Sequence, residues 1–216
     1  MTGYRNEFRF SGNVVHKYYQ EEQKRLILTL SILKRDHSGK GDGTDRVRVN
    51  YPTVLVQGEM AVKLNEKIST EKKFQFVEVI CHAASEYVMR YAGDGNYKKE
   101  RRLVFVVDEI LGTDRFVNVN DACISGKVMR SWHSDDPDKK FYLVDVECGR
   151  DRFQVTCFDQ NMMLDPKVGE GIMIFAEAQT ARREIQAWAG ERKTSYYMTI
   201  VARTVLIERG DGNIAA

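Results

Sequence analysis

The strongest constraint on the fold lies near the end of the chain, in residues 171–207. Two runs rich in β-branched and aromatic residues, 172–181 and 196–207, have the composition and length of long β-strands. The segment between them has no apolar periodicity and carries four cations around a single tryptophan, Trp188. We therefore expect a β-hairpin whose connection is a basic loop with an aromatic ring. Such a loop can attract phosphate groups and stack on a nucleobase.

The preceding 50 or so residues contain three more strand patterns, followed by a short helix. Residues 122–132 carry a mid-strand glycine, Gly126, as a strand bent at a barrel corner requires. Residues 141–148 and 152–158 alternate between apolar and polar side chains, so each strand should have one buried face. Residues 159–168 predict a short helix. Three strands, a helix and two strands are the element order of an OB-fold barrel.

The N-terminal half follows the same order of elements, although the two halves share little residue identity. We expect strands over 8–18, 26–33, 46–56, 74–83 and 102–111, a helix over 59–68, a loop over 85–101 and a linker over 112–121. Pro52 should bend the third strand, and the run 26–33 reads as apolar on both faces, which predicts a surface for self-association. The sequence thus predicts an all-β protein with short helices, built as two tandem five-stranded OB-fold barrels over residues 1–115 and 116–216.

The charge distribution argues against binding by bulk positive charge. The chain has 33 Lys and Arg residues against 31 Asp and Glu residues, a formal net charge of +2. Residues 1–115 hold 20 of these cations and 16 of these anions, whereas 116–216 hold 13 and 15. We therefore expect local basic grooves, stronger in the N-terminal half, rather than a uniformly basic surface.

The sequence lacks the motifs of several other function classes. Its four histidines and four cysteines do not have the spacing of a zinc site, a triad or a nucleophile motif. This predicts no metal, no cofactor, no small-molecule substrate and no enzymatic activity. No segment reaches the roughly 18 apolar residues that cross a bilayer, so we expect a cytoplasmic, nucleoid-associated protein. Cys148 and Cys157 fall in strand patterns and should be buried, reduced thiols.

Three stretches of the C-terminal half carry a resemblance to a known family: 120–132, 152–162 and 171–207. They hold a first strand with a mid-strand glycine, a third strand that ends on Phe158, and a hairpin with Trp188 before an aromatic-rich last strand. In these stretches the chain resembles the bacterial single-stranded DNA-binding protein (SSB) family, as a tandem-barrel variant without the acidic C-terminal tail. The resemblance implies OB folds, single-stranded DNA as the partner, and Phe158 as a residue that stacks on DNA.

Candidate nucleic-acid contacts are aromatic and cationic residues at the strand ends and hairpins where an OB fold binds its ligand. In the C-terminal half they are Lys127, Arg130, Trp132, Arg152, Phe158, Arg182, Arg183, Trp188, Arg192, Lys193 and Tyr196. In the N-terminal half they are Lys17, Tyr18, Tyr19, Lys34, Arg35, Arg46, Arg48, Tyr87, Arg90, Tyr91, Tyr97 and Lys98.

Several of these candidates also have a purely structural interpretation. Trp188 could instead fold onto the barrel wall or join a dimer contact. The polar face at Arg152 is also typical of a solvated outer sheet face. Tyr87 and Tyr91 have the i, i+4 spacing of a helix packed on the barrel. Near Trp132, the aspartates at 135, 136 and 138 would repel phosphate.

Together, these features predict binding and protection of single-stranded DNA without sequence preference, in replication, recombination or repair. Phosphate contacts would supply attraction and aromatic stacking would hold the bases. We expect the protein to self-associate. Two alternatives stay open at this point: an OB-fold module for protein interaction or assembly, and binding of single-stranded RNA.

Overall fold

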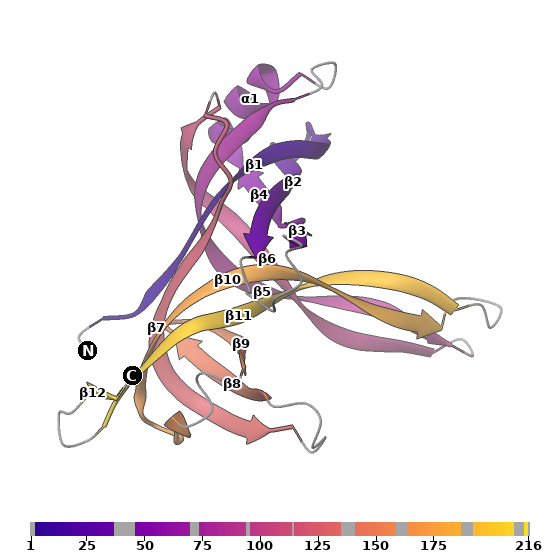
Figure 1. Cartoon of the computed structure of the whole chain (residues 1–216). Coiled ribbons are helices and arrows are strands. Elements are labelled where there is room, and N and C mark those ends of the chain that lie inside the picture. Colours follow the sequence, from indigo (N-terminus) through magenta and orange to yellow (C-terminus); the bar gives the residue numbers. More distant parts are fainter. Residues whose placement is uncertain are drawn as a thin grey trace. The chain divides into compact units, whose positions relative to one another are not determined.

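The computed structural model describes residues 3–36, 46–69, 74–93, 96–113, 115–134, 141–158, 164–186, 192–209 and 214–215. Within them the chain is almost entirely β-structure (Figure 1), which confirms the predicted all-β class. The elements are β1 (Arg5–Gln20), β2 (Arg25–Asp36), β3 (Arg46–Asn50), β4 (Thr53–Gln57), α1 (Gly58–Lys67), β5 (Phe76–Gly93), β6 (Asn96–Gly112), β7 (Val119–His133), β8 (Phe141–Cys148), β9 (Asp151–Phe158), β10 (Gly171–Gln186), β11 (Arg192–Glu208) and β12 (Ile214–Ala215).

The C-terminal barrel consists of β7 to β11. Antiparallel pairing joins β7 to β8, β8 to β9, and β10 to β11, and β11 then pairs in parallel with β9. β7 also pairs with β10, which closes the ring in the order β7-β8-β9-β11-β10. The closed ring buries one face of each strand. Its core includes Tyr142, Val144, Phe153, Val155 and Ile174.

The N-terminal barrel repeats this order with β1, β2, β4, β6 and β5. β1 pairs with both β2 and β5, β2 with β4, β4 in parallel with β6, and β6 neighbours β5. The predicted third strand is interrupted at Pro52, as expected, so that β3 and β4 both pair with β2. α1 lies between the third and fourth barrel strands, as in other OB folds. Two five-stranded OB-fold barrels in tandem are therefore confirmed.

The first strands of the two barrels repeat each other in detail. Gly12 and Gly126 lie 114 positions apart, and an added Cβ at either would collide with a carbonyl oxygen of the next strand. The residue after each glycine, Asn13 or Lys127, pairs with one strand on each side of β1 or β7. A bulge then follows at the same distance in both strands. The glycines thus allow the backbones to approach closely where the barrel strand changes partner.

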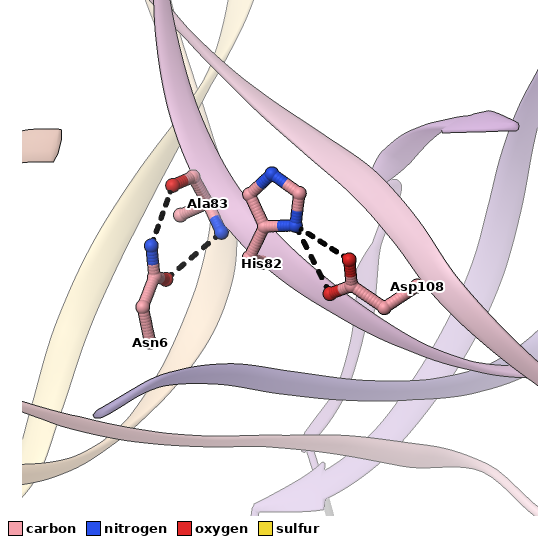
Figure 2. Close-up of polar contacts among 4 residues, drawn as sticks. All are labelled: Asn6, His82, Ala83 and Asp108. Carbon is pink, nitrogen blue, oxygen red and sulfur yellow. Dashed lines mark hydrogen bonds and ion pairs between the residues drawn. The ribbon is translucent and has the colours of Figure 1, made fainter. Parts of the chain in front are cut away.

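The chain divides into two compact units that are discontinuous in sequence. The N-terminal barrel unit contains Phe8–His82 and Phe105–Asp121, and the C-terminal barrel unit contains Met1–Glu7, Ala83–Val104 and Ala122–Ala216. Figure 2 shows polar contacts near the unit boundary on β5. His82 Nδ1 lies 2.8 and 3.0 Å from the two carboxylate oxygens of Asp108. The Asn6 side chain donates to Ala83 O at 2.7 Å and accepts from Ala83 N at 2.9 Å.

Two segments predicted as loops are extended strand pairs. The predicted loop 85–101 belongs to β5 and β6, and the basic segment after residue 181 continues β10 and β11 as far as Gln186 and Arg192. We call residues 83–104 the β5–β6 arm and residues 179–199 the β10–β11 arm. The loop predictions were wrong because, beyond Ala83, the described side chains of the two arms are not buried on either face. A strand pair without a buried face has no need of alternating apolar residues, so the sequence does not show that pattern there.

Three smaller expectations can be compared with the structure. In the run 26–33, Leu26, Leu28, Leu30 and Ile32 form a fully buried face. The outer face is mixed, because Ile27 and Leu33 alternate there with Thr29 and Ser31. The predicted helical spacing of Tyr87 and Tyr91 falls in a strand. Of the predicted helix 159–168, residues 159–163 lie outside the described residues, and Leu164 is in a 3-10 turn.

Two free cysteines, Cys148 and Cys157, lie in the core of the C-terminal barrel. Cys148 and Cys157 are buried and unpaired to other cysteines, as expected, and burial raises the pKa of Cys157 to about 12 and that of Cys148 to about 11. Because both folded pKa values exceed the ordinary value of about 8.5, the neutral thiols stabilise the fold fully below about pH 8.5. This contribution is lost as the pH rises towards 11–12.

We therefore expect the urea midpoint of unfolding to fall steeply above about pH 9, because the unfolded chain then gains by releasing thiol protons. Cys157→Ala should make this fall shallower, although it lowers the midpoint at neutral pH through loss of packing. Urea titrations between neutral and alkaline pH, followed by circular dichroism, measure both effects. An equally steep alkaline fall in the variant would show that Cys157 does not contribute.

Candidate nucleic-acid interface

The outer face of β8 and β9 has an aromatic end and an ionic end. The alternating pattern places Tyr142, Val144, Val146 and Cys148 inside, together with Phe153, Val155 and Cys157, as predicted. On the outside, Phe141 lies opposite Phe158 and Leu143 opposite Thr156. The two phenylalanine rings meet edge to face, with centroids 6.1 Å apart. Phe158 is 47% exposed, so its ring is accessible to a ligand.

Trp132 extends the aromatic end onto β7. It lies opposite Leu143, so the row Trp132–Leu143–Thr156 crosses three strands on one face. The guanidinium carbon of Arg130 is 4.7 Å from the centroid of the Trp132 ring. The Trp132 ring therefore has the Arg130 cation on one side. A nucleobase stacked on this ring would bring the phosphate of its nucleotide close to the positive charge of Arg130.

The ionic end holds cations that face carboxylates. Arg152 donates to Asp145 Oδ2 at 2.9 Å. Arg130 lies opposite Asp145 in the strand register, and Lys127, which is exposed, lies opposite Glu147. Phosphate attraction at this end is therefore weaker than the cations alone suggest.

The β10–β11 arm presents a different tyrosine to this face than the sequence indicated. Thr156 Oγ1 and Thr199 Oγ1 are 3.5 Å apart, so the Thr199 side of β11 continues the outer face of β9. Tyr197, two residues earlier, lies on that side, whereas Tyr196 lies on the other side opposite Arg182. The side chains of Arg183, Arg192 and Lys193, and the whole of Trp188, lie outside the described residues.

The N-terminal barrel has an equivalent outer row. Tyr18 lies opposite Ile27, and Ile27 opposite Leu55, across β1, β2 and β4. Tyr18 is 52% exposed. It follows Gly12 by six positions, as Trp132 follows Gly126, and so occupies the same place in the barrel. Among the residues predicted at the end of β1, Tyr18 is therefore the one that corresponds to Trp132 at the end of β7.

Lys17 and Tyr19, the neighbours of Tyr18, project to the opposite side of β1, since they lie opposite the buried Leu28 and Leu26. The Lys17 ammonium donates to the carbonyl oxygens of Asn65 and Ile68 at 2.7 and 2.6 Å. Burial lowers the pKa of Lys17. Lys17 thus binds the C-terminal end of α1, a structural role that the sequence did not indicate.

The remaining N-terminal candidates lie on two hairpins. Lys34 lies opposite Arg48, beside the glycine-rich segment 37–45, which is outside the described residues. On the β5–β6 arm Tyr87, Tyr97 and Lys98 are exposed. The side chains of Arg35, Arg46, Arg90 and Tyr91 lie outside the described residues, although their backbones belong to β2, β3 and β5.

Sequence reasoning missed two residues that hold the β5–β6 arm: Asn6 and Ser85. Ser85 Oγ donates to the carbonyl oxygen of Arg152 at 3.0 Å. Within the described ranges, no group of three His, Cys, Asp or Glu side chains is placed to hold a metal ion. No helix among the described residues has the length and apolar character needed to cross a membrane.

These features define the class of the protein: two tandem OB-fold barrels, each with an aromatic residue on the face where OB folds bind oligonucleotides. The structure is similar to crystal structures of the single-stranded DNA binding protein from Thermus aquaticus. The wild-type structure has a TM-score of 0.67 at 14% identity, covering 94% of this chain and 93% of that chain. A deletion mutant has a TM-score of 0.67 at 14% identity, with 95% of each chain covered.

This similarity confirms, at the level of the fold, the resemblance noted from the sequence, and it extends over both barrels. Neither the protein-family models nor the curated proteins give a match to the sequence.

Proposed function

We propose that the chain binds single-stranded DNA without sequence preference, with one binding face on each barrel. The observation that carries this proposal is the repeated outer row, with Tyr18 in one barrel and Trp132 in the other at the same distance from the strand glycine. A ring in that place can stack on any base, because every base has a π-face. The fold similarity to the Thermus aquaticus protein, which is described as single-stranded DNA binding, supports the proposal.

Local cations would supply the attraction to phosphate. Arg130 beside Trp132, and Lys99, whose Nζ is 4.3 Å from the Tyr87 ring centroid, each place a positive charge against an aromatic ring. Two OB folds at about 4–16 nucleotides each predict a site of roughly 10–30 nucleotides per chain. We further propose a non-catalytic role in DNA replication, recombination or repair, in the cytoplasm at the nucleoid, by a protein that self-associates.

A protein-interaction role for the C-terminal barrel is the second candidate function. It is favoured by the ionic end of the β8–β9 face, where Arg152 is paired with Asp145 and where Arg130 and Lys127 lie opposite carboxylates. Such a surface has little net charge. It would suit a polar protein partner better than a run of phosphates.

The proposal predicts salt-dependent binding that quenches tryptophan fluorescence, because Trp132 lies on the binding face. Titration with oligothymidylate of about 30 nucleotides should give a log K that falls with log salt, with a slope of about −0.7 for each phosphate contacted. Oligouridylate and a DNA duplex are the matched competitors. Absence of quenching and of binding at low salt would contradict the proposal and favour the protein-interaction role. Tighter binding of oligouridylate would assign the site to RNA.

A further inference from the structure

The β5–β6 arm contacts the candidate interface of the C-terminal barrel. The arm begins where the Asn6 side chain holds the backbone of Ala83 with two hydrogen bonds. Two residues further on, Ser85 Oγ donates to Arg152 O, on β9. The whole segment Ala83–Val104 belongs to the C-terminal barrel unit, although β5 and β6 also supply strands to the N-terminal barrel. The arm is therefore fixed at its base beside the ionic end of the β8–β9 face.

An open cavity of about 350 Å³ lies at this contact. It is lined by Ser85, Tyr87, Asp145, Arg150, Asp151 and Arg152. The Arg152 guanidinium bonds Asp145 through one terminal nitrogen, whereas its buried Nε has no hydrogen-bond partner among the described residues. The Arg152 side chain as a whole is 41% exposed, so the accessible part of its guanidinium can interact with a phosphate of a ligand in the cavity.

Tyr87 supplies the aromatic wall of the cavity. Its side chain is 64% exposed, and Lys99 Nζ lies 4.3 Å from the ring centroid. The tyrosine thus pairs a ring with a cation, as Trp132 does with Arg130. A base stacked on the ring would bring its phosphate within reach of the ammonium.

We propose that the β5–β6 arm completes the single-stranded DNA site of the C-terminal barrel, with Tyr87 stacking on a base and the Arg152 guanidinium beside a phosphate. The inference rests on the proposed function and assigns the arm to one barrel. The six-residue step from Phe158 to Arg152 along β9 spans about 20 Å, at about 3.3 Å per residue. One strand that covers the 4–16 nucleotides expected of an OB fold would reach from the aromatic end to the arm.

The test is to place Tyr87→Leu in three backgrounds and measure affinity for oligothymidylate of about eight nucleotides, short enough for one OB fold. The backgrounds are the unmodified chain, Tyr18→Leu, which disables the N-terminal row, and Trp132→Leu with Phe158→Leu, which disables the C-terminal face. We expect Tyr87→Leu to weaken binding about fivefold or more in the first two. In the third background it should have almost no effect. Tyr4→Leu is the matched control, an exposed tyrosine of the same unit, 57% exposed.

Two results would overturn the inference while leaving the proposed function intact. One is an unchanged affinity of Tyr87→Leu in every background. The other is a loss that disappears with Tyr18→Leu and persists with the Trp132 and Phe158 changes, which would assign the arm to the N-terminal barrel. If the unmodified chain fails to bind the oligonucleotide at low salt, the proposed function and the inference fall together.

Discussion

Gly126→Ala is expected to lower the free energy of unfolding of the C-terminal barrel by about 3 kcal/mol, at the upper end of the usual cost of overpacking. A Cβ at this position would lie 2.1 Å from the carbonyl oxygen of Glu147 and 2.9 Å from its carbonyl carbon. Backbone atoms held in the β7–β8 ladder cannot rotate away as a side chain can. The strand must therefore move, at the point where β7 changes partner from β10 to β8.

Urea denaturation followed by circular dichroism measures this loss, and two other glycines serve as comparisons. Gly12→Ala should cost less, because its Cβ would lie 2.7 Å from Ser31 O and 2.8 Å from Ile32 Cγ1, part of a movable side chain. Gly112→Ala meets nothing within 4 Å and should change stability by less than about 0.5 kcal/mol. Equal midpoints for Gly126→Ala and Gly112→Ala would show that the close approach in β7 is not rigid.

Trp132→Ala is expected to weaken binding of an oligothymidylate of about 30 nucleotides about tenfold, within the 1–3 kcal/mol that one stacked base contributes. The loss should leave the slope of log K against log salt unchanged, because no charge is removed. Trp132→Phe keeps a ring in the row Trp132–Leu143–Thr156 and should restore most of the affinity. Anisotropy of a labelled oligonucleotide measures binding without relying on the tryptophan itself.

Arg182→Gln provides the complementary control. Arg182 is exposed on the β10–β11 arm, opposite Tyr196. If Arg182 contacts a phosphate, its loss should make the slope of log K against log salt shallower by about 0.7, the contribution of one phosphate contact. The preference among bases should not change. A Trp132→Ala variant that binds as tightly as the unmodified chain would contradict the stacking role of Trp132. A changed salt slope in that variant would indicate an altered fold.

Much of the barrel architecture was predictable because its strands bury one face. In β8 and β9 the alternation of side chains matched the burial residue by residue, and Pro52 marked the break in the third strand. The arms were not predictable in the same way. Arg182 lies opposite Tyr196 on one face and Gln179 opposite Thr199 on the other, so neither face of that ladder is apolar. A pattern that depends on burial carries no signal where a strand pair leaves the core.

The sequence indicated which segments carry candidate contacts, but not which side chains of those segments lie on the outer face. Lys17, Tyr18 and Tyr19 are adjacent in sequence, yet Tyr18 alone lies on the outer row, because alternate residues of a strand point to opposite faces. The six-residue spacing from the strand glycine to Tyr18 and to Trp132 was the signal that could have separated them. No comparable signal marks Ser85, since its contact joins residues 67 positions apart.

The discontinuous makeup of the C-terminal unit has a consequence for synthesis of the chain. Residues Met1–Glu7 and Ala83–Val104 leave the ribosome before the barrel strands of Ala122–Ala216 to which they belong. At about 5–20 residues per second, the arm would wait on the order of ten seconds for its partners. Its tyrosines and its two strand edges are open to other chains during that interval. The exposed charged residues of the arm, which include Glu86, Lys98 and Lys99, would then help to keep the nascent protein from aggregating.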